Sequence, residues 1–454
     1  MAKISRRKFL ISSAKNAACL GVMAGCNSQT IRPDIRPPSA PVGLFGYSVY
    51  EDSMKKVELE WVKHDLSDNT GVEGKEEIKG YNIYYKDSKT PLNTSIIKEP
   101  NYLDEGPDGN GLEEGNTYEY QITALDQNEN ESERSEKYPV KISKPVPVYE
   151  VTDDNACNGI QLNADIIQSM VNSAVKAFTE KQSVAEAYEL LFPRIKDKYP
   201  KIAIKINCLA GNGLCTHPEV VEAIIKGLGQ MFNSTYPLHN ITVFDDRKES
   251  HLKAAGFLLK SSTDDYRITT VYGETNTHGE SNWGEEVLIY NTSQRFCKIV
   301  EETDYIINVP VLKDHSSAGI TFALKNFFGI ISDPISMHHP MCDPYVSEVY
   351  KIVEKKVKLI IGDAILGAFK GGPSTNASFD PKKILAGNDP VAMDMRALRL
   401  INNERQSQSK PLFEIKTKAD AQFPSRTDAR HIITSSMSKY DLGTTNYKTV
   451  EVAI

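Results

Sequence analysis

The stretch from Asp304 to Ile331 constrains the fold of this chain more than any other segment. Tyr305–Leu312 is an apolar, β-branched run that predicts a buried strand, and Ile320–Ile331 has the apolar spacing of a mostly buried helix. Polar and charged side chains lie between and within these two elements. Because burying an unpartnered ion costs several kcal/mol, these side chains predict a lined pocket. An ordinary solvated loop between strand and helix is the alternative.

The candidate catalytic residues of this stretch are Lys313, His315 and Lys325. Lys313 and His315 are two positions apart, so they would point to one face if the strand continues through them. Thr321 and Lys325 are four positions apart, so they would share a face of the predicted helix. A crossover could bring both sets around one anion, with lysine supplying charge and histidine a proton near neutral pH.

The surrounding sequence alternates strands and helices. Residues 201–207 predict a strand with its isoleucines facing inward, and residues 241–244 predict a second strand. Between them, Thr216-His217-Pro218-Glu219 resembles a capping box that opens a helix through Met231. This βαβ pattern favours an α/β domain with a mainly parallel sheet and right-handed crossovers.

Polar side chains stand at the ends of several predicted strands, where open α/β sheets bind ligands. The candidate ligand-binding residues, which combine charge with amide and hydroxyl groups, are Lys205, Asn207, Thr321, Asn326 and Asp363. The candidate metal ligands are His217, Asp245 and Asp394, whose side chains suit a divalent cation. Neither a GxGxxG nor a Walker A motif occurs, so nucleotide binding has little support.

The first 25 residues have the features of an export signal. Ser5-Arg6-Arg7-Lys8-Phe9-Leu10, with its pair Arg6 and Arg7, resembles the twin-arginine motif, and a weakly apolar segment follows. That segment is too polar and too short to span a bilayer stably. We therefore expect residues 1–25 to be a signal peptide and the twin-arginine translocase to be a partner during export.

The end of this signal resembles a bacterial lipobox. It reads Met23-Ala24-Gly25-Cys26, and Cys26 would be lipidated and become the first mature residue. A plain cleaved signal with an incidental cysteine is the alternative. Residues 26–40, rich in Pro, Ser and Asn, would then be a tether to a membrane of the bacterial cell envelope.

Charge and cysteine content exclude several classes of function. Without the five basic residues of the signal, 48 basic side chains face 60 acidic ones, which argues against a general nucleic-acid role. No CxxC motif occurs, so neither an iron–sulfur cluster nor a zinc ribbon is encoded by clustered cysteines. Cys208 and Cys215 flank one loop and could form a disulfide in an oxidising compartment.

Residues 41–143 show short alternating strands separated by turn residues, which predicts an all-β sandwich. This segment resembles a fibronectin type III domain. The resemblance rests on Trp61 as the core tryptophan, Gly80–Tyr85 as the third strand, Leu112–Tyr118 as the tyrosine corner, and Ala124–Ser132. It implies a spacer or binding module and no chemistry of its own.

Residues 147–454 form the predicted α/β domain. From about Asp165 to Val452 this domain resembles the family called domain of unknown function 362 (DUF362). The motifs that carry the resemblance are Ile204–Asn207, Thr216–Glu219, Asn308–His315, Ala318–Thr321, Ala323–Gly329, Gly362–Ala364, Gly371–Pro373 and Gly387–Ala392. Some members carry an added ferredoxin segment, whose cysteines this chain lacks. The resemblance therefore implies a domain type but neither a reaction nor a cofactor.

Three hypotheses about function remain open at this stage. The α/β domain could be an enzyme acting on a small anion, with or without the assistance of a metal. It could instead bind an anionic molecule without turnover, or it could serve as a scaffold in the cell envelope. A tightly bound ligand would separate the first two from the third, and turnover would separate the first from the second.

Overall fold

The computed structural model describes residues 37–51, 54–63, 78–260, 265–275, 281–338, 342–413 and 429–454. Arg6, Arg7 and Cys26, and with them the expected signal and lipidation site, lie outside these ranges. Among the helices in the described ranges, none is both long enough and apolar enough to cross a bilayer.

The N-terminal region is rich in β-structure. Its strands form two antiparallel three-stranded sheets: β1 (Phe45–Glu51), β2 (Met54–Glu60) and β4 (Asn101–Asp104), and β3 (Ile78–Tyr85), β5 (Thr117–Asp126) and β6 (Tyr138–Lys141). Alternation of apolar and polar residues buries one face of each sheet in a common core. Trp61 lies in that core with its ring edge-on to Tyr81, at a centroid distance of 5.2 Å.

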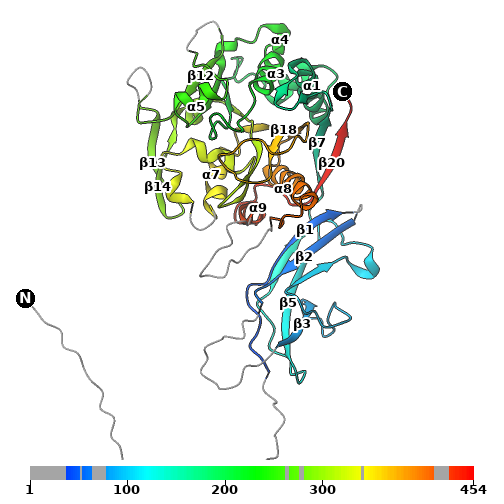
Figure 1. Cartoon of the computed structure of the whole chain (residues 1–454). Coiled ribbons are helices and arrows are strands. Elements are labelled where there is room, and N and C mark those ends of the chain that lie inside the picture. Colours follow the sequence, from blue (N-terminus) through cyan, green and yellow to red (C-terminus); the bar gives the residue numbers. More distant parts are fainter. Residues whose placement is uncertain are drawn as a thin grey trace, which may run out of the picture. The chain divides into compact units, whose positions relative to one another are not determined.

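The C-terminal region contains a ten-stranded sheet (Figure 1). Its main order is β12–β11–β10–β15–β18–β19–β7–β20, while β16 pairs with β18 and β17. The strands are β7 (Val146–Thr152), β10 (Ile202–Lys205), β11 (Ile241–Asp245), β12 (Arg267–Thr270), β15 (Tyr305–Asn308), β16 (Val311–His315), β17 (Gly319–Thr321), β18 (Val357–Ala368), β19 (Lys383–Gly387) and β20 (Tyr447–Val452). Most neighbouring pairs are parallel, so the expected α/β domain with a mainly parallel sheet is confirmed.

Helices cover both faces of this sheet. The helices are α1 (Ala164–Thr179), α2 (Val184–Leu191), α3 (Pro218–Leu228), α4 (Met231–Ser234), α5 (Glu249–Ala254), α6 (Lys298–Glu302), α7 (Tyr345–Val353), α8 (Pro390–Ser407) and α9 (Arg430–Ser436). Residues of α1, α2 and α3 share one core with Ile202 and Ile204, whereas residues of α7, α8 and α9 share the other with Ala203. Alternate residues of one strand therefore belong to opposite layers.

Short elements complete the fold. They are the hairpins β8 (Cys157–Asn158) with β9 (Gln161–Leu162) and β13 (Trp283–Ile289) with β14 (Thr292–Cys297), and the 3₁₀ helices η1 (Pro107–Gly109), η2 (Leu238–Asn240), η3 (Lys325–Ile330) and η4 (Ile335–Met337).

The structure corrects the prediction for the stretch 304–331. The predicted strand is divided at Val309-Pro310 into β15 and β16, because proline has no N–H to donate to a ladder. The predicted helix over 320–331 is wrong: the chain turns back as β17, antiparallel to β16, and then forms η3. The apolar residues there are buried as predicted, but in irregular backbone.

The predicted βαβ unit is confirmed, with a different start to its helix. β10, α3 and β11 follow in order, and the two strands are parallel neighbours. The N-cap of α3 is His217, and its side chain makes no capping hydrogen bond, so the predicted capping box is wrong. Thr216 instead donates to the Val309 carbonyl and accepts from the Asn207 N–H, which ties the loop to the sheet.

Candidate functional site

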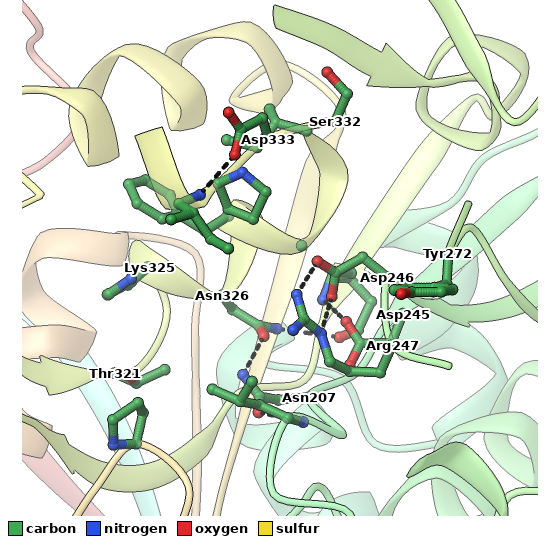
Figure 2. A pocket seen from close by; sticks show the side chains of 18 of the residues that line it. Asn207, Asp245, Asp246, Arg247, Tyr272, Thr321, Lys325, Asn326, Ser332 and Asp333 are labelled. Atoms are coloured by element: carbon green, nitrogen blue, oxygen red, sulfur yellow. Dashed lines mark hydrogen bonds and ion pairs between the residues drawn. The ribbon is translucent and has the colours of Figure 1, made fainter. Parts of the chain in front are cut away.

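A cavity of about 460 Å³ lies at the carboxyl ends of β10 and β11, and residues of η3, among them the labelled Lys325 and Asn326, also line it (Figure 2). Seven of the residues singled out from the sequence line it together: Lys205, Asn207, Asp245, His315, Thr321, Lys325 and Asn326. They come from three separate stretches of the chain, around residues 205–207, at 245 and within 315–326. Parallel strands end at the same edge of a sheet, which is why residues so distant in sequence meet here.

Lys205 and Asp245 form a buried ion pair in the wall of this cavity. Their side chains are only 1 % and 4 % exposed, and Lys205 Nζ lies 2.6 Å from Asp245 Oδ1. Burial would raise the pKa of Asp245, but Lys205 and the Cys208 N–H, which donates at 2.6 Å, hold that pKa below its ordinary value. Gly329 permits this arrangement, because a β-carbon there would stand 2.7 Å from Lys205 Nζ.

A second pair continues the same wall. Arg247 Nε donates to Asp246 Oδ1 at 2.7 Å, and a further contact joins Arg247 Nη2 to Asp246 Oδ2. Burial and the neighbouring Asp245 carboxylate raise the pKa of Asp246, against the opposing effect of Arg247. The two adjacent carboxylates are thus each balanced by one cation.

A network of asparagines fixes η3 against the sheet. Asn326 accepts from Asn207 Nδ2 at 3.1 Å and donates to Asn308 Oδ1 at 2.8 Å, and Asn308 donates to the Ala323 carbonyl. All three asparagines are buried. The network therefore fixes the position of Asn326, the residue that directly follows Lys325.

Lys325 places an ammonium group in the cavity with no carboxylate partner among the described residues. The residue is 6 % exposed, and its Nζ lies 4.0 Å from the centre of the Phe328 ring and 3.5 Å from His338 Nε2. Burial lowers the pKa of Lys325. Because His338 Nδ1 lies 2.7 Å from the Pro334 carbonyl and must donate to it, Nε2 faces Lys325 as an acceptor.

Thr321 and His315 lie beside Lys325. Thr321 is 4 % exposed, and its hydroxyl has no hydrogen-bond partner. His315 stacks on His338 at a ring-centre distance of 5.7 Å. Burial, with the nearby charge of Lys325, lowers the pKa of His315 well below its ordinary value. Its Nδ1 accepts from the Ser317 N–H, so the neutral ring carries its proton on Nε2.

Lys313 lies outside the lining, behind Asn207. It is fully buried, and its Nζ donates to Asn207 Oδ1 at 2.7 Å and to the Leu214 carbonyl at 3.4 Å. Burial lowers the pKa of Lys313 to about 8. In the structure Lys313 therefore supports Asn207 and does not touch the cavity.

The candidate metal ligands do not come together. His217 Nδ1 lies 2.8 Å from Asp363 Oδ2, and Asp245 is paired with Lys205. Asp394, at the start of α8, accepts the Ala323 N–H at 2.6 Å and so holds the chain that leads into η3. Within the described ranges, no three His, Cys, Asp or Glu side chains are grouped as a metal site.

Asp363 likewise lies away from the cavity, as the partner of His217. Its carboxylate also accepts the His217 backbone N–H, so it holds the start of α3. Cys208 and Cys215, which were expected to be able to pair, are free buried thiols in the structure. The sequence reasoning missed Arg247 and Tyr272 in the lining, although Arg247 directly follows the two aspartates at a strand end.

Fold and site together define an α/β domain with a largely parallel sheet and a polar cavity at its strand ends. Residues 202–399 of the chain match a family model, described as "Domain of unknown function (DUF362)". This match supports the family resemblance of that segment. No curated protein matches the chain.

Several solved structures show partial likeness. The spore cortex lytic enzyme SleM of Clostridium perfringens is 24 % identical over 23 % of this chain and 28 % of its own, with a TM-score of 0.17. The lactate racemase apoprotein of Thermoanaerobacterium thermosaccharolyticum is 10 % identical over 57 % and 58 %, with a TM-score of 0.33. The human titin module A71 is 22 % identical over 24 % and 89 %, with a TM-score of 0.15.

This chain covers less than two thirds of the lytic enzyme and of the racemase. Because all three TM-scores are below 0.5, these likenesses carry no argument about fold or function.

Proposed function

We propose that this is an exported, lipid-anchored protein whose α/β region binds a small anionic molecule in the cavity beside Lys325. The N-terminal region would act as a fibronectin type III-like spacer. In support of that spacer, Tyr118 accepts a hydrogen bond from the Glu113 N–H at 3.1 Å, the kind of contact that a tyrosine corner makes.

The buried, unpaired ammonium of Lys325 carries the proposal. Desolvating a lysine costs several kcal/mol, and a structure retains such a group when something compensates. The partners of the ammonium in the described structure are the Cys342 thiol and His338 Nε2 at 3.5 Å, and neither is a carboxylate. An anion would supply the missing charge, and the free hydroxyl of Thr321 would supply a second donor.

Replacing Lys325 with Met tests the anion site. The change keeps most of the side-chain volume and removes the charge, so the affinity for an anion should fall by about 1.5–3 kcal/mol, or roughly 10- to 150-fold. The measurement is calorimetric titration with acetate, 3-phenylpropanoate, phosphate and citrate, together with any anion that native mass spectrometry finds on the exported protein.

Lys370→Met is the matched control. Lys370 is exposed outside the cavity, and its Nζ also lies over a phenylalanine ring, Phe369, at 5.1 Å. Its loss should leave anion affinity unchanged. Equal affinities of wild type and Lys325→Met for every anion would refute the site. Because the pKa of Lys325 is lowered, affinity should be full where the anion is ionised and Lys325 is protonated, and it should decline with rising pH earlier than an exposed lysine would give.

Acid–base catalysis on the bound anion is the second candidate function. It is favoured by the neutral His315, with a proton on Nε2, stacked against His338 next to Lys325. An imidazole held beside a bound ligand can take part in proton transfer as a general acid or base. Turnover by wild type that is lost in His315→Gln, with anion affinity retained, would favour an enzyme over a binding protein.

Changing Cys26 to Ala tests the membrane anchor. A lipobox cysteine is the attachment point of the lipid, so the variant should move from the membrane fraction to the soluble envelope fraction. Replacing Arg6 and Arg7 with Lys should instead retain the precursor in the cytoplasm. The measurement is immunoblotting of cell fractions, and a Cys26→Ala protein that still sediments with membranes would argue against lipid anchoring at this residue.

A further inference from the structure

We propose that the ligand is an organic monocarboxylate whose apolar or aromatic body fills the rest of the cavity. The inference rests on the proposed anion site at Lys325 and names the class of anion that the site would accept. It follows from the charge balance, the donors, the size and the apolar surface of the cavity.

The charged side chains of the lining largely cancel one another. Lys205 is paired with Asp245 and Arg247 with Asp246. Glu274, also in the lining, is paired at 2.8 Å with Arg295. These pairs bring no net charge to a ligand.

Two charged side chains of the described lining remain outside these pairs. One is Asp333 at the rim, whose carboxylate accepts the N–H groups of Ile335 and Ser336 and so serves the turn into η4. The other is Lys325, inside the cavity. His315 adds no charge, because its lowered pKa keeps the ring neutral.

One buried positive charge balances one negative charge. A carboxylate carries one, whereas a phosphate group carries up to two near neutral pH, and proteins usually meet it with several cations or a helix N-terminus. The described lining offers neither beside Lys325. A phosphate ligand with two charges would leave one of them uncompensated, whereas a carboxylate would not.

The donors also match a carboxylate. Lys325 and Thr321 lie on the same side of the cavity in Figure 2, away from Arg247 and Tyr272. The ammonium and the free hydroxyl can each give a hydrogen bond to one of the two carboxylate oxygens. Both side chains are almost fully buried, so the head of the ligand would be shielded from water.

The cavity is much larger than a simple anion needs. Its volume of about 460 Å³ lies in the range of pockets that hold whole organic molecules, roughly 300–1,000 Å³. A water molecule's share of the liquid is about 30 Å³, so a four-atom anion such as acetate would leave most of the space to water. A larger body attached to the carboxylate would fill it.

The remaining walls suit an apolar body. Phe328, Ile331 and Pro334 line the cavity. Tyr272 and Ile335, which are 51 % and 79 % exposed, also belong to the lining and present large apolar surfaces to solvent. Burying these surfaces under a ligand is favourable, since apolar surface would be removed from water.

A matched set of small molecules tests the inference on the full chain. Methyl, phenylethyl and indolylmethyl bodies are each joined to a carboxylate, a primary amide or a phosphate, and affinities are measured by ligand-observed NMR and calorimetry. We expect the aryl carboxylates to bind at least tenfold more tightly than acetate, and at least tenfold more tightly than their own amides and phosphates.

Two variants, each with a control, test which residue binds the carboxylate of the ligand and which contacts its apolar body. Lys325→Met, or Lys325→Gln if the first variant loses its native circular dichroism, should abolish the preference for carboxylate over amide, and Lys370→Met should keep it. Tyr272→Ala should reduce the difference in affinity between the aryl carboxylates and acetate. The control is Tyr290→Ala, which removes a tyrosine that is 55 % exposed and lies outside the lining. This control should leave the difference in affinity unchanged.

The outcomes separate this inference from the proposed function. If phosphates bind as tightly as carboxylates and this binding depends on Lys325, the inference of a monocarboxylate ligand is wrong, but the proposed anion site stands. Acetate binding as tightly as the aryl carboxylates would overturn the apolar body. If no compound binds in a Lys325-dependent way, both the inference and the anion site fall.

Discussion

Replacing Asp245 with Asn is expected to lower the free energy of unfolding by about 3–5 kcal/mol, the range for breaking a buried ion pair from one side. The change leaves the Lys205 ammonium, 1 % exposed, with a backbone carbonyl at 2.6 Å as its remaining close partner. It also weakens the acceptor of the Cys208 N–H. Chemical denaturation at pH 7 measures the loss.

The double variant Lys205→Met with Asp245→Asn should cost less than the sum of the two single variants, because no unpaired charge stays buried. The more solvent-accessible pair Lys260–Asp265, whose side chains are 37 % and 41 % exposed and whose Nζ and Oδ2 lie 3.0 Å apart, is the matched control. Asp265→Asn should change stability by less than about 1 kcal/mol. Losses of similar size for Asp245→Asn and Asp265→Asn would show that burial does not increase the contribution of the Lys205–Asp245 pair to stability.

The pH dependence of this pair follows from the lowered pKa of Asp245. A carboxyl with a lowered folded-state pKa contributes stability above its unfolded pKa, near 4, and loses it as pH falls through the folded value. The deficit of Asp245→Asn should therefore stay constant between pH 7 and pH 5.

Lys313 is expected to make the protein more stable as pH rises from about 8 to about 10.5. Burial lowers its folded-state pKa to about 8, so in this window the unfolded chain holds a proton that the folded chain lacks. Stability then increases with pH by up to about 1.4 kcal/mol per unit, about 3 kcal/mol in all. Urea denaturation at several pH values from 7 to 10.5 measures the increase.

The variant Lys313→Met should lack this increase, because methionine has no proton to lose. Lys355→Met removes an exposed lysine and should follow the wild-type curve. Comparing variants cancels the many other groups that titrate in alkali. Parallel curves for wild type and Lys313→Met would mean that Lys313 is not held in a desolvated site.

The sequence predicted the elements whose signals are local. The alternation of Ile202, Ile204 and Ile206 predicted the strand β10, and all three residues lie in one of the two cores that the sheet separates. Asp389-Pro390 is a local helix-start signal, and the Asp389 side chain accepts the Ala392 N–H at the N-cap of α8. Such signals depend on neighbours within a few residues, which a sequence displays directly.

The same reasoning failed where distant partners decide the backbone. The apolar spacing from Ile320 to Ile331 is compatible with a helix, but the Ala323 N–H and Leu324 N–H are taken by Asp394, and Asn326 bonds to Asn207 and Asn308. These long-range bonds satisfy backbone and amide groups that a helix would have used. Periodicity alone cannot reveal them.

For the site, the sequence by itself determined which kinds of residue stand at the strand ends, because polar groups after buried strands can be read in order. Only the tertiary structure decided which of them keep a free charge. It pairs Lys205 with Asp245 and Asp363 with His217, places Lys313 behind Asn207, and leaves Lys325 without a carboxylate among the described residues. The physical reason is that ion pairing depends on distances between segments up to 146 residues apart, which no local pattern encodes.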